Sequence, residues 1–156
     1  MVKAAKKIYV QTDGSCIGQG MPYARAGWGY HVTGAISFQD HGHVPGKQDV
    51  NRAEAYAMLQ ALKALSKHIE SVDEIYIKTD SEDTVNGFTN YRVRIHNSDI
   101  WDEIREVLLI VSPKLRKIEH INRDKNSKAD VLAFQAASAL LFLDEEGNNK
   151  SFGQAQ

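Results

Sequence analysis

Two stretches of alternating apolar and polar residues each run into a Thr-Asp pair, and this repeat constrains the fold more than any other feature of the chain. Residues 7–12 alternate with the two-residue period of a strand before Asp13, and residues 74–79 do the same before Asp80. If the second strand lies beside the first and parallel to it, both carboxylates emerge at the same edge of one sheet. Neighbouring strands are about 4.8 Å apart, so two such carboxylates could share a cation.

Each of these motifs, taken alone, is also a good turn sequence. Thr-Asp-Gly-Ser at 12–15 and Thr-Asp-Ser-Glu at 79–82 can start an Asx turn, in which the Asp side chain hydrogen-bonds to the main chain. A single copy would favour the turn. The repetition favours chemistry, because adjacent carboxylates destabilise a fold unless a cation neutralises them.

The hydrophobic periodicity orders the chain as three strands, a helix, a strand, two helices, a strand and a last helix. Strands are expected over residues 7–12, 26–32, 34–41, 74–79 and 115–121. Helices are expected over residues 51–67, 81–87, 97–112 and 126–143. Gly34 indicates a tight hairpin within an antiparallel meander, and a right-handed crossover would return the fourth strand parallel to the first.

Length and composition indicate one globular domain of 156 residues, with its core over about 7–143 and a polar tail over 144–156. No apolar run approaches the roughly 20 residues of a membrane span, and no secretory signal is evident, so we expect a cytoplasmic protein. The single cysteine, Cys16, excludes an internal disulfide and fits a reducing compartment. With a net charge of −1, nucleic-acid binding would have to rest on local patches.

Two further acidic residues fall on predicted helices. Glu54 shares a helical stripe with Met58 and Leu65, and a glutamate on such a face is rare without a partner, although it could instead complement the helix dipole. Asp130 follows Ser127 at the spacing of a capping box, which is its alternative role. Four carboxylates without a Cys or His cluster favour a hard cation, Mg²⁺ or Mn²⁺, over zinc.

Four segments in this order resemble the acidic motifs of the type 1 ribonuclease H family: TDGSC at 12–16, NRAEAYAMLQAL at 51–62, KTDSEDTVNGFTNY at 78–91 and INRDKNSKADVLA at 121–133. The match runs from about Tyr9 to Phe142. The resemblance implies an α/β, ribonuclease H-like fold: a five-stranded mixed sheet with helices on both faces. It also implies an endoribonuclease that cleaves the RNA strand of RNA–DNA hybrids and leaves 5′-phosphate and 3′-hydroxyl ends.

The same resemblance implies roles for individual residues. The implied ligands of two Mg²⁺ ions, with Mn²⁺ as the alternative ion, are Asp13, Glu54, Asp80 and Asp130. The implied substrate contacts are Gly14, Ser15, Cys16, Lys47, Asn51, Ser81 and Asn97. Cys16 is expected to contact or pack rather than act as a nucleophile, because no His/Asn arrangement surrounds it. The expected partner is an RNA–DNA hybrid, bound by a monomer without an obligate protein partner.

The sequence departs from the family pattern in two places. The long basic protrusion is trimmed to residues 90–99, and Asp49 or Val50 replaces an expected phosphate-pocket threonine, so we expect weak hybrid binding with a shallow salt dependence. The family's loop histidine has two candidate counterparts. His120 keeps its separation from the last aspartate but fits the fifth strand, whereas Arg123 lies in the loop. We favour Arg123 as the auxiliary catalytic group.

Three alternatives remain open at this point. A non-catalytic hybrid-binding module of the same fold would be expected to lack one of the four acids, and all four are present. A transposase or integrase core would be expected within a larger chain with extra DNA-binding segments. A ribonuclease H domain of a reverse transcriptase shares the motifs, and here Met1 and the complete first strand favour a standalone enzyme.

Overall fold

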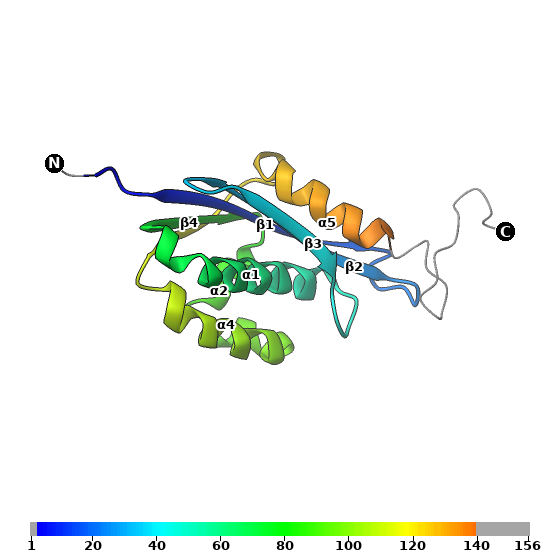
Figure 1. Cartoon of the computed structure of the whole chain (residues 1–156). Coiled ribbons are helices and arrows are strands. Elements are labelled where there is room, and N and C mark those ends of the chain that lie inside the picture. The colour runs from blue at the N-terminus through cyan, green and yellow to red at the C-terminus, as the bar shows by residue number, and fades with distance from the viewer. Residues whose placement is uncertain (1–2, 140–156) are drawn as a thin grey trace.

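A five-stranded mixed sheet carries the fold, which confirms the architecture implied by the resemblance (Figure 1). The computed structural model describes residues 3–139. Its strands are β1 (Lys7–Ile17), β2 (Arg25–Gly34), β3 (Phe38–His43), β4 (Glu74–Thr79) and β5 (Leu115–His120), in the sheet order β3-β2-β1-β4-β5. The first three strands pair antiparallel, and β4 pairs parallel to both β1 and β5, as the meander and the crossover predicted.

Helices cover both faces of this sheet. They are α1 (Val50–Lys67), α2 (Glu82–Gly87), α3 (Tyr91–Arg94), α4 (Ser98–Val111) and α5 (Ser127–Ala139), with 3₁₀ turns at Ile69–Ser71, Ile95–Asn97 and Arg123–Lys125. Figure 1 shows α1 and α4 on one side of the sheet and α5 on the other. The predicted element order is correct except for α3, which the sequence analysis missed. The parts of the predicted last helix, core and polar tail beyond residue 139 lie outside the described residues.

The core lies between the sheet and α1. Alternate side chains of β1 and β4, such as Ile8 and Ile77, are fully buried against α1 residues such as Met58 and Leu62. The predicted apolar stripe of α1 is therefore the face that packs on the sheet. Helix α4 packs on the outer side of α1 through buried residues such as Ile104. This arrangement holds the N-terminal turns of α1 close to β1.

The expectation that the first strand ends at Thr12, just before Asp13, is wrong. Strand β1 continues to Ile17 because β2 keeps pairing with it, from Asp13 opposite Gly29 to Ile17 opposite Arg25. The parallel ladder with β4 does stop at this point, since its last pair joins Thr12 to Thr79. Asp13 is thus paired with β2 but not with β4, and it does not start a turn.

Helix α5 lies unusually close to β2 because two strand positions are glycine. A Cβ atom on Gly27 would lie 2.4 Å from the main-chain nitrogen of Ala137, and one on Gly29 would lie 2.7 Å from that of Ala133. Real Cβ atoms do not approach main chain so closely, so only glycine allows this contact. The first turn of α5 is thereby brought down to the sheet beside Asp13.

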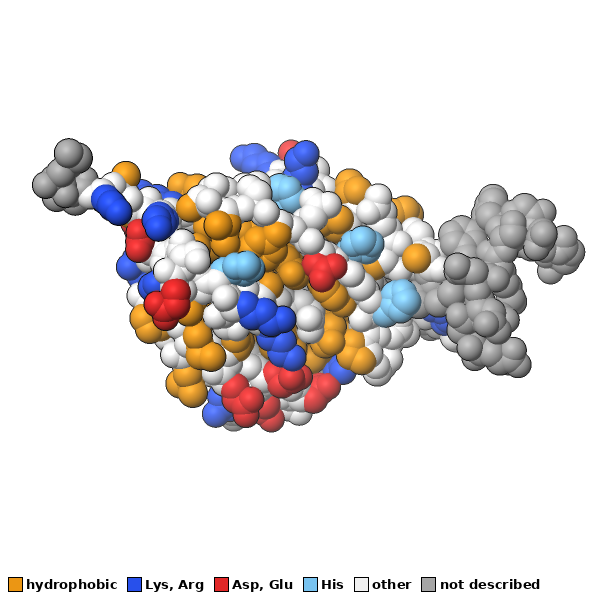
Figure 2. All heavy atoms as spheres, in the orientation of Figure 1, with side chains coloured by type: hydrophobic (Ala, Val, Ile, Leu, Met, Phe, Trp, Pro, Cys, Tyr) orange, Lys and Arg blue, Asp and Glu red, His pale blue; other side chains and the backbone are white. Residues whose placement is uncertain are grey.

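Charged side chains are distributed without a dominant sign on the face seen in Figure 2, where small groups of basic and acidic residues are interspersed among apolar ones. This agrees with the net charge of −1. Within residues 3–139, no helix is both long enough and apolar enough to cross a membrane.

Candidate active site

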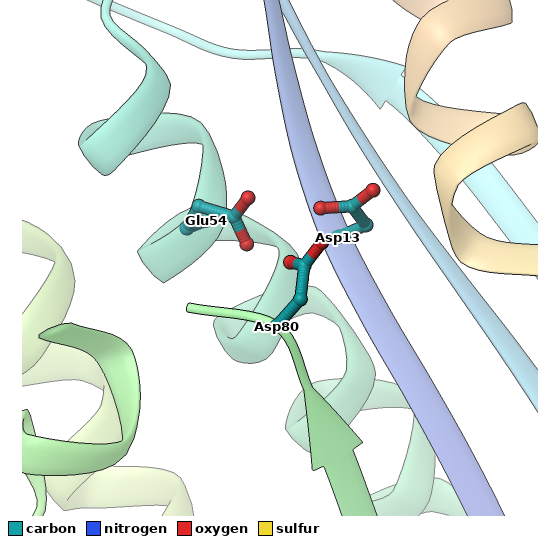
Figure 3. Close-up of side chains that lie close together, drawn as sticks. All are labelled: Asp13, Glu54 and Asp80. Atoms are coloured by element: carbon teal, nitrogen blue, oxygen red, sulfur yellow. The ribbon is translucent and has the colours of Figure 1, made fainter. Parts of the chain in front are cut away.

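Three acidic side chains from separate segments point toward one another at one edge of the sheet (Figure 3). Asp13 comes from β1, Glu54 from the N-terminal half of α1 and Asp80 from the residue after β4. One carboxylate oxygen from each lies within 4.8 Å of the other two. The expected juxtaposition of Asp13 and Asp80 is therefore present, and Glu54 joins it from the helix.

Direct contact between β1 and α1 brings Asp13 and Glu54 together. A Cβ atom on Gly14 would lie 2.3 Å from the main-chain nitrogen of Glu54 and 2.4 Å from the carbonyl carbon of Ala53. Helix α1 begins shortly before, at the N-cap Asp49, whose carboxylate accepts hydrogen bonds from the main-chain N–H groups of Asn51 and Arg52. The missing side chain of Gly14 therefore makes room for α1, a function that the sequence analysis did not foresee.

Asp80 occupies the junction between a strand and a helix. Strand β4 ends at Thr79, and Ser81 caps α2 by accepting a hydrogen bond from the main-chain N–H of Thr84 at 3.1 Å. The N–H of Ser81 in turn donates to the Thr79 hydroxyl at 3.1 Å. These local bonds fix the main chain on both sides of Asp80 while its carboxylate faces the cluster.

The fourth predicted acid, Asp130, approaches the cluster from α5. It lies in the first turn of that helix and is close enough to Asp13 to raise the pKa of the Asp13 carboxyl. Its own carboxylate is part-exposed and lies 3.9 Å from the guanidinium of Arg123. Helix α5 starts at Ser127, so Asn126 rather than Ser127 holds the position before the helix.

Burial favours the protonated forms of Asp13 and Glu54. Burial, then the charge of Asp80 and the proximity of Asp130, raise the pKa of Asp13 from 3.8 to about 8, although hydrogen bonding by the Glu54 side chain lowers it. Burial and the neighbouring Asp13 also raise the pKa of Glu54 well above its usual range. Glu54 is only 7% exposed, and its Oε2 atom has no hydrogen-bond partner among the described residues. An orphaned carboxylate oxygen beside two others fits a hard divalent cation, which takes oxygen ligands and would offset the repulsion.

The acidic cluster lies in an open cleft of about 590 Å³. Most of the predicted substrate contacts also line it, namely Gly14, Ser15, Cys16, Asn51 and Ser81, together with Arg123. Cys16 is half-buried, and burial raises the pKa of its thiol, so the group stays protonated near neutral pH.

The other two predicted contacts, Lys47 and Asn97, line a neighbouring cavity of about 330 Å³, which shares Asn51 with the cleft. Arg52 organises one wall of this cavity by donating to both carboxylate oxygens of Asp99, at 3.0 and 2.7 Å, and to Oδ1 of Asn97 at 3.3 Å. With its oxygen so occupied, the amide of Asn97 keeps its N–H groups for a ligand.

Asp49 places a negative charge in the same cavity. Burial tends to raise its pKa, but hydrogen bonds from Gln19, Arg52 and Asn51 outweigh burial and lower it. The carboxylate is therefore ionised at neutral pH. Asp49 is one of the two residues, with Val50, that could replace the threonine of the family pattern, and its negative charge would oppose any anion in this cavity.

The two candidates for the auxiliary group differ in their surroundings. Arg123 extends into solvent at the cleft, with its side chain 83% exposed. His120 ends β5, and its Nε2 lies 3.1 Å from the main-chain oxygen of Asp80. Because a carbonyl only accepts, this ring nitrogen donates the hydrogen bond. His120 thus contacts the main chain of one acid, whereas Arg123 contacts the side chain of another.

Several residues that shape the site were missed in the sequence. Asn126 is fully buried and donates to the main-chain oxygen of Thr12, and Gln19 bonds to the N-cap Asp49. Gly27 and Gly29 lie in a segment that the sequence pattern predicts only as a strand. Alternate glycines in a strand do signal close approach by another element, which could have identified the seat of α5. A buried asparagine has no comparable signal in a single sequence.

Comparisons with known proteins agree with this fold. The family model described as RNase H matches residues 5–138. A ribonuclease H of Chlorobium phaeobacteroides (strain BS1) is 29% identical over 147 residues, covering 84% of this chain and 95% of that protein. The structure of LC11-RNase H1, isolated from compost by a metagenomic approach, is 25% identical with a TM-score of 0.67, covering 87% of this chain and 99% of that one. A structure of LC11-RNase H1 in complex with an RNA/DNA hybrid has a TM-score of 0.67 at 24% identity, covering 86% of this chain and 99% of that one.

Proposed function

Because this chain belongs to the ribonuclease H family, we propose that it hydrolyses the RNA strand of RNA–DNA hybrids and leaves 5′-phosphate and 3′-hydroxyl ends. The observation that carries the proposal is the convergence of Asp13, Glu54 and Asp80, three carboxylates within 4.8 Å of one another at the wall of an open cleft. Three carboxylates at this surface would repel the phosphates of a nucleic acid. Bound cations between the carboxylates and the phosphates would remove this repulsion.

The proposed ligands of two Mg²⁺ ions are Asp13, Glu54, Asp80 and Asp130. The donor set fits, because all four are carboxylates and the Glu54 carboxylate, whose Oε2 has no hydrogen-bond partner among the described residues, points toward Asp13 and Asp80. The chemistry that bound ions supply in such a site is a lowered pKa for the attacking water and stabilisation of charge on the phosphoryl and departing 3′-oxygens. Asp13 and Glu54, whose pKa values are raised, must release their protons to bind ions, which makes ion affinity dependent on pH.

The cleft residues are proposed to recognise the RNA strand. Ser15, Asn51 and Ser81 are polar residues that line the cleft together with the acids. Groups of this kind can exchange hydrogen bonds with the 2′-hydroxyls that distinguish RNA from DNA. Arg123, exposed at the rim of the cleft and 3.9 Å from Asp130, is proposed to contact the phosphate backbone near the point of cleavage.

The neighbouring cavity is proposed to hold a phosphate of the DNA strand, with Lys47 and the amide of Asn97 as donors. The ionised Asp49 in the same cavity weakens this contact. Fewer effective phosphate contacts lower both the affinity and its salt dependence, by a slope of roughly 0.9 per phosphate on duplex DNA. We therefore propose that hybrid binding is weak and changes little with salt.

The proposal is tested with four labelled duplexes: RNA–DNA, RNA–RNA, DNA–DNA and a DNA duplex with one ribonucleotide, each with Mg²⁺ or with EDTA. Cleavage of the RNA strand of the hybrid in Mg²⁺, and its loss in EDTA, is expected. Binding of the hybrid without cleavage would instead identify a non-catalytic module. Cleavage of the all-DNA duplex would identify a transposase-like nuclease.

Substitution of the acids gives a second test of the same proposal. Asp13→Asn or Asp80→Asn should lower hybrid cleavage by orders of magnitude while leaving the circular dichroism spectrum unchanged, because each keeps its shape and loses its charge. Turnover near the wild-type rate in either variant would contradict the assignment.

A further inference from the structure

Asn126 connects the segments that carry Asp13 and Asp130. Its side chain is fully buried, and its Nδ2 donates a hydrogen bond of 2.8 Å to the main-chain oxygen of Thr12, a residue 114 positions away. Thr12 immediately precedes Asp13 in β1. The main-chain oxygen of Asn126 accepts a bond of 3.0 Å from the main-chain N–H of Asp130. A single residue is therefore bonded to the neighbour of one acid and to the main chain of another.

The packing of α5 on the sheet explains why such a tether is needed. The helix rests on Gly27 and Gly29 of β2 through small residues such as Ala133 and Ala137. This close contact fixes the height of the helix above the sheet. Small side chains such as alanine form low ridges, which do little to stop the helix from sliding or turning about its axis. The bond from Asn126 to Thr12 supplies that restraint at the end of the helix where Asp130 lies.

The stability of the fold does not by itself account for this side chain. Oδ1 of Asn126 is buried and has no hydrogen-bond partner among the described residues. Burying an unpaired carbonyl costs at least as much as one neutral hydrogen bond contributes. The amide therefore gives little net stability, and its benefit lies in where it holds α5.

We propose that Asn126 is a positioning residue, which sets Asp130 relative to Asp13 and thereby tunes the affinity of the acidic cluster for a divalent cation. Any effect of Asn126 on catalysis rests on the metal-dependent function proposed above. Its effect on the position of Asp130 does not depend on which substrate the protein cleaves. Partners that orient metal ligands from outside the ligand set usually affect affinity almost as strongly as they affect activity.

Calorimetric titration of Mn²⁺ into the metal-free protein tests the proposal without nucleic acid. Asn126→Ala and Asn126→Ser both remove the bond to Thr12, and serine remains a favourable residue before a helix, so this variant is expected to fold. Both should bind Mn²⁺ about 10-fold more weakly than the wild type. The control is Ala136→Gly, which weakens α5 on the same seat but keeps the tether; it should stay within about twofold of the wild type.

A double-mutant cycle with Asp130→Asn determines whether Asn126 acts through Asp130. If it does, Asn126→Ser has no further effect on Mn²⁺ affinity once Asp130 is replaced. Two results would overturn the proposal. In the first, the Asn126 variants bind Mn²⁺ as tightly as the Ala136→Gly control. In the second, Asn126→Ser lowers Mn²⁺ affinity as much in the Asp130→Asn protein as in the wild type. The Mn²⁺ titration contains no hybrid, so its result does not depend on the cleavage assay. Failure of the cleavage assay would contradict the proposed function alone.

Discussion

Gly14 and Glu54 touch through their main chains: a Cβ atom on Gly14 would lie 2.3 Å from the nitrogen of Glu54. The contact joins β1 to α1 one residue from Asp13, so the distance between two of the acids depends on the absence of a single methyl group. The geometry of the cluster is thus sensitive to packing around it, and not only to the acids themselves.

Gly14→Ala is expected to force α1 away from β1. The methyl group meets main chain, which cannot rotate aside, so the free energy of unfolding should fall by roughly 1–3 kcal/mol and hybrid cleavage should fall with it. Chemical denaturation and a cleavage assay measure both effects. Gly20→Ala is the matched control, since a Cβ atom there meets nothing within 4 Å and only the positive φ of 81° opposes it. Equal effects in the two variants would contradict the packing explanation.

The metal-free protein should lose stability as the pH rises. The pKa of Asp13 is raised by burial from 3.8 to about 8 in the folded state, so the folded state binds the proton more tightly than the unfolded chain. The stability that comes from this proton is complete below about pH 4 and is lost as the pH passes about 8. Thermal unfolding in EDTA should therefore give a Tm that decreases between pH 5 and pH 9.

Asp13→Asn should flatten this pH dependence, because the amide cannot ionise. Asp40→Asn, at an exposed position on β3, is the control and should leave the dependence unchanged. A wild-type Tm that rises over the same pH range would show that Asp13 is ionised and stabilised in the folded protein without a cation.

Asp49→Asn should strengthen hybrid binding. Asparagine is as good an N-cap as aspartate, so α1 keeps its start while the negative charge leaves the phosphate cavity. Removing one repelling charge at a part-exposed site should raise affinity by roughly threefold to tenfold at low salt, with a smaller gain at high salt. Fluorescence anisotropy of a labelled hybrid in EDTA measures the affinity of both proteins for the hybrid.

The substitution at Asp49 also disturbs a hydrogen bond of 3.0 Å from Gln19 Nε2, so Gln19→Ala is needed as the control. That variant removes the bond and keeps the charge. If Gln19→Ala strengthens binding as much as Asp49→Asn does, the charge of Asp49 is not the cause.

Arg123→Ala should lower hybrid turnover more than His120→Ala. The guanidinium of Arg123 lies at the cleft beside Asp130, whereas His120 uses its Nε2 to hold the main-chain oxygen of Asp80. If Arg123 faces the developing charge as proposed, its loss should reduce kcat roughly 10-fold or more, and Arg123→Lys should recover part of it. A larger loss in His120→Ala would reverse the assignment, and no loss in either would mean that the reaction uses no auxiliary group here.

The acids could be predicted from the sequence because their motifs occur together: each motif alone favours a turn or a helix cap, whereas the repeat and the four motifs in order favour a shared site. Glu54 interrupts an apolar helical stripe, and Asp80 follows a strand whose bounds were predicted correctly. The end of β1 was misplaced because its last five residues pair only with β2, and this pairing leaves no mark in the residues themselves. The same holds for Asn126, whose partner is 114 positions away. The extent of the domain, the monomeric state and the cellular location stay predictions.

The central claim is that Asp13, Glu54 and Asp80 hold a divalent cation, and anomalous diffraction from crystals soaked in Mn²⁺ tests it most directly. We expect a manganese peak within about 2.5 Å of carboxylate oxygens from all three residues, and its loss in Glu54→Gln crystals. The account would be contradicted if anomalous density lay only at other surface acids. This result requires that protein from the same crystals, once dissolved, cleaves hybrids in the same Mn²⁺ solution.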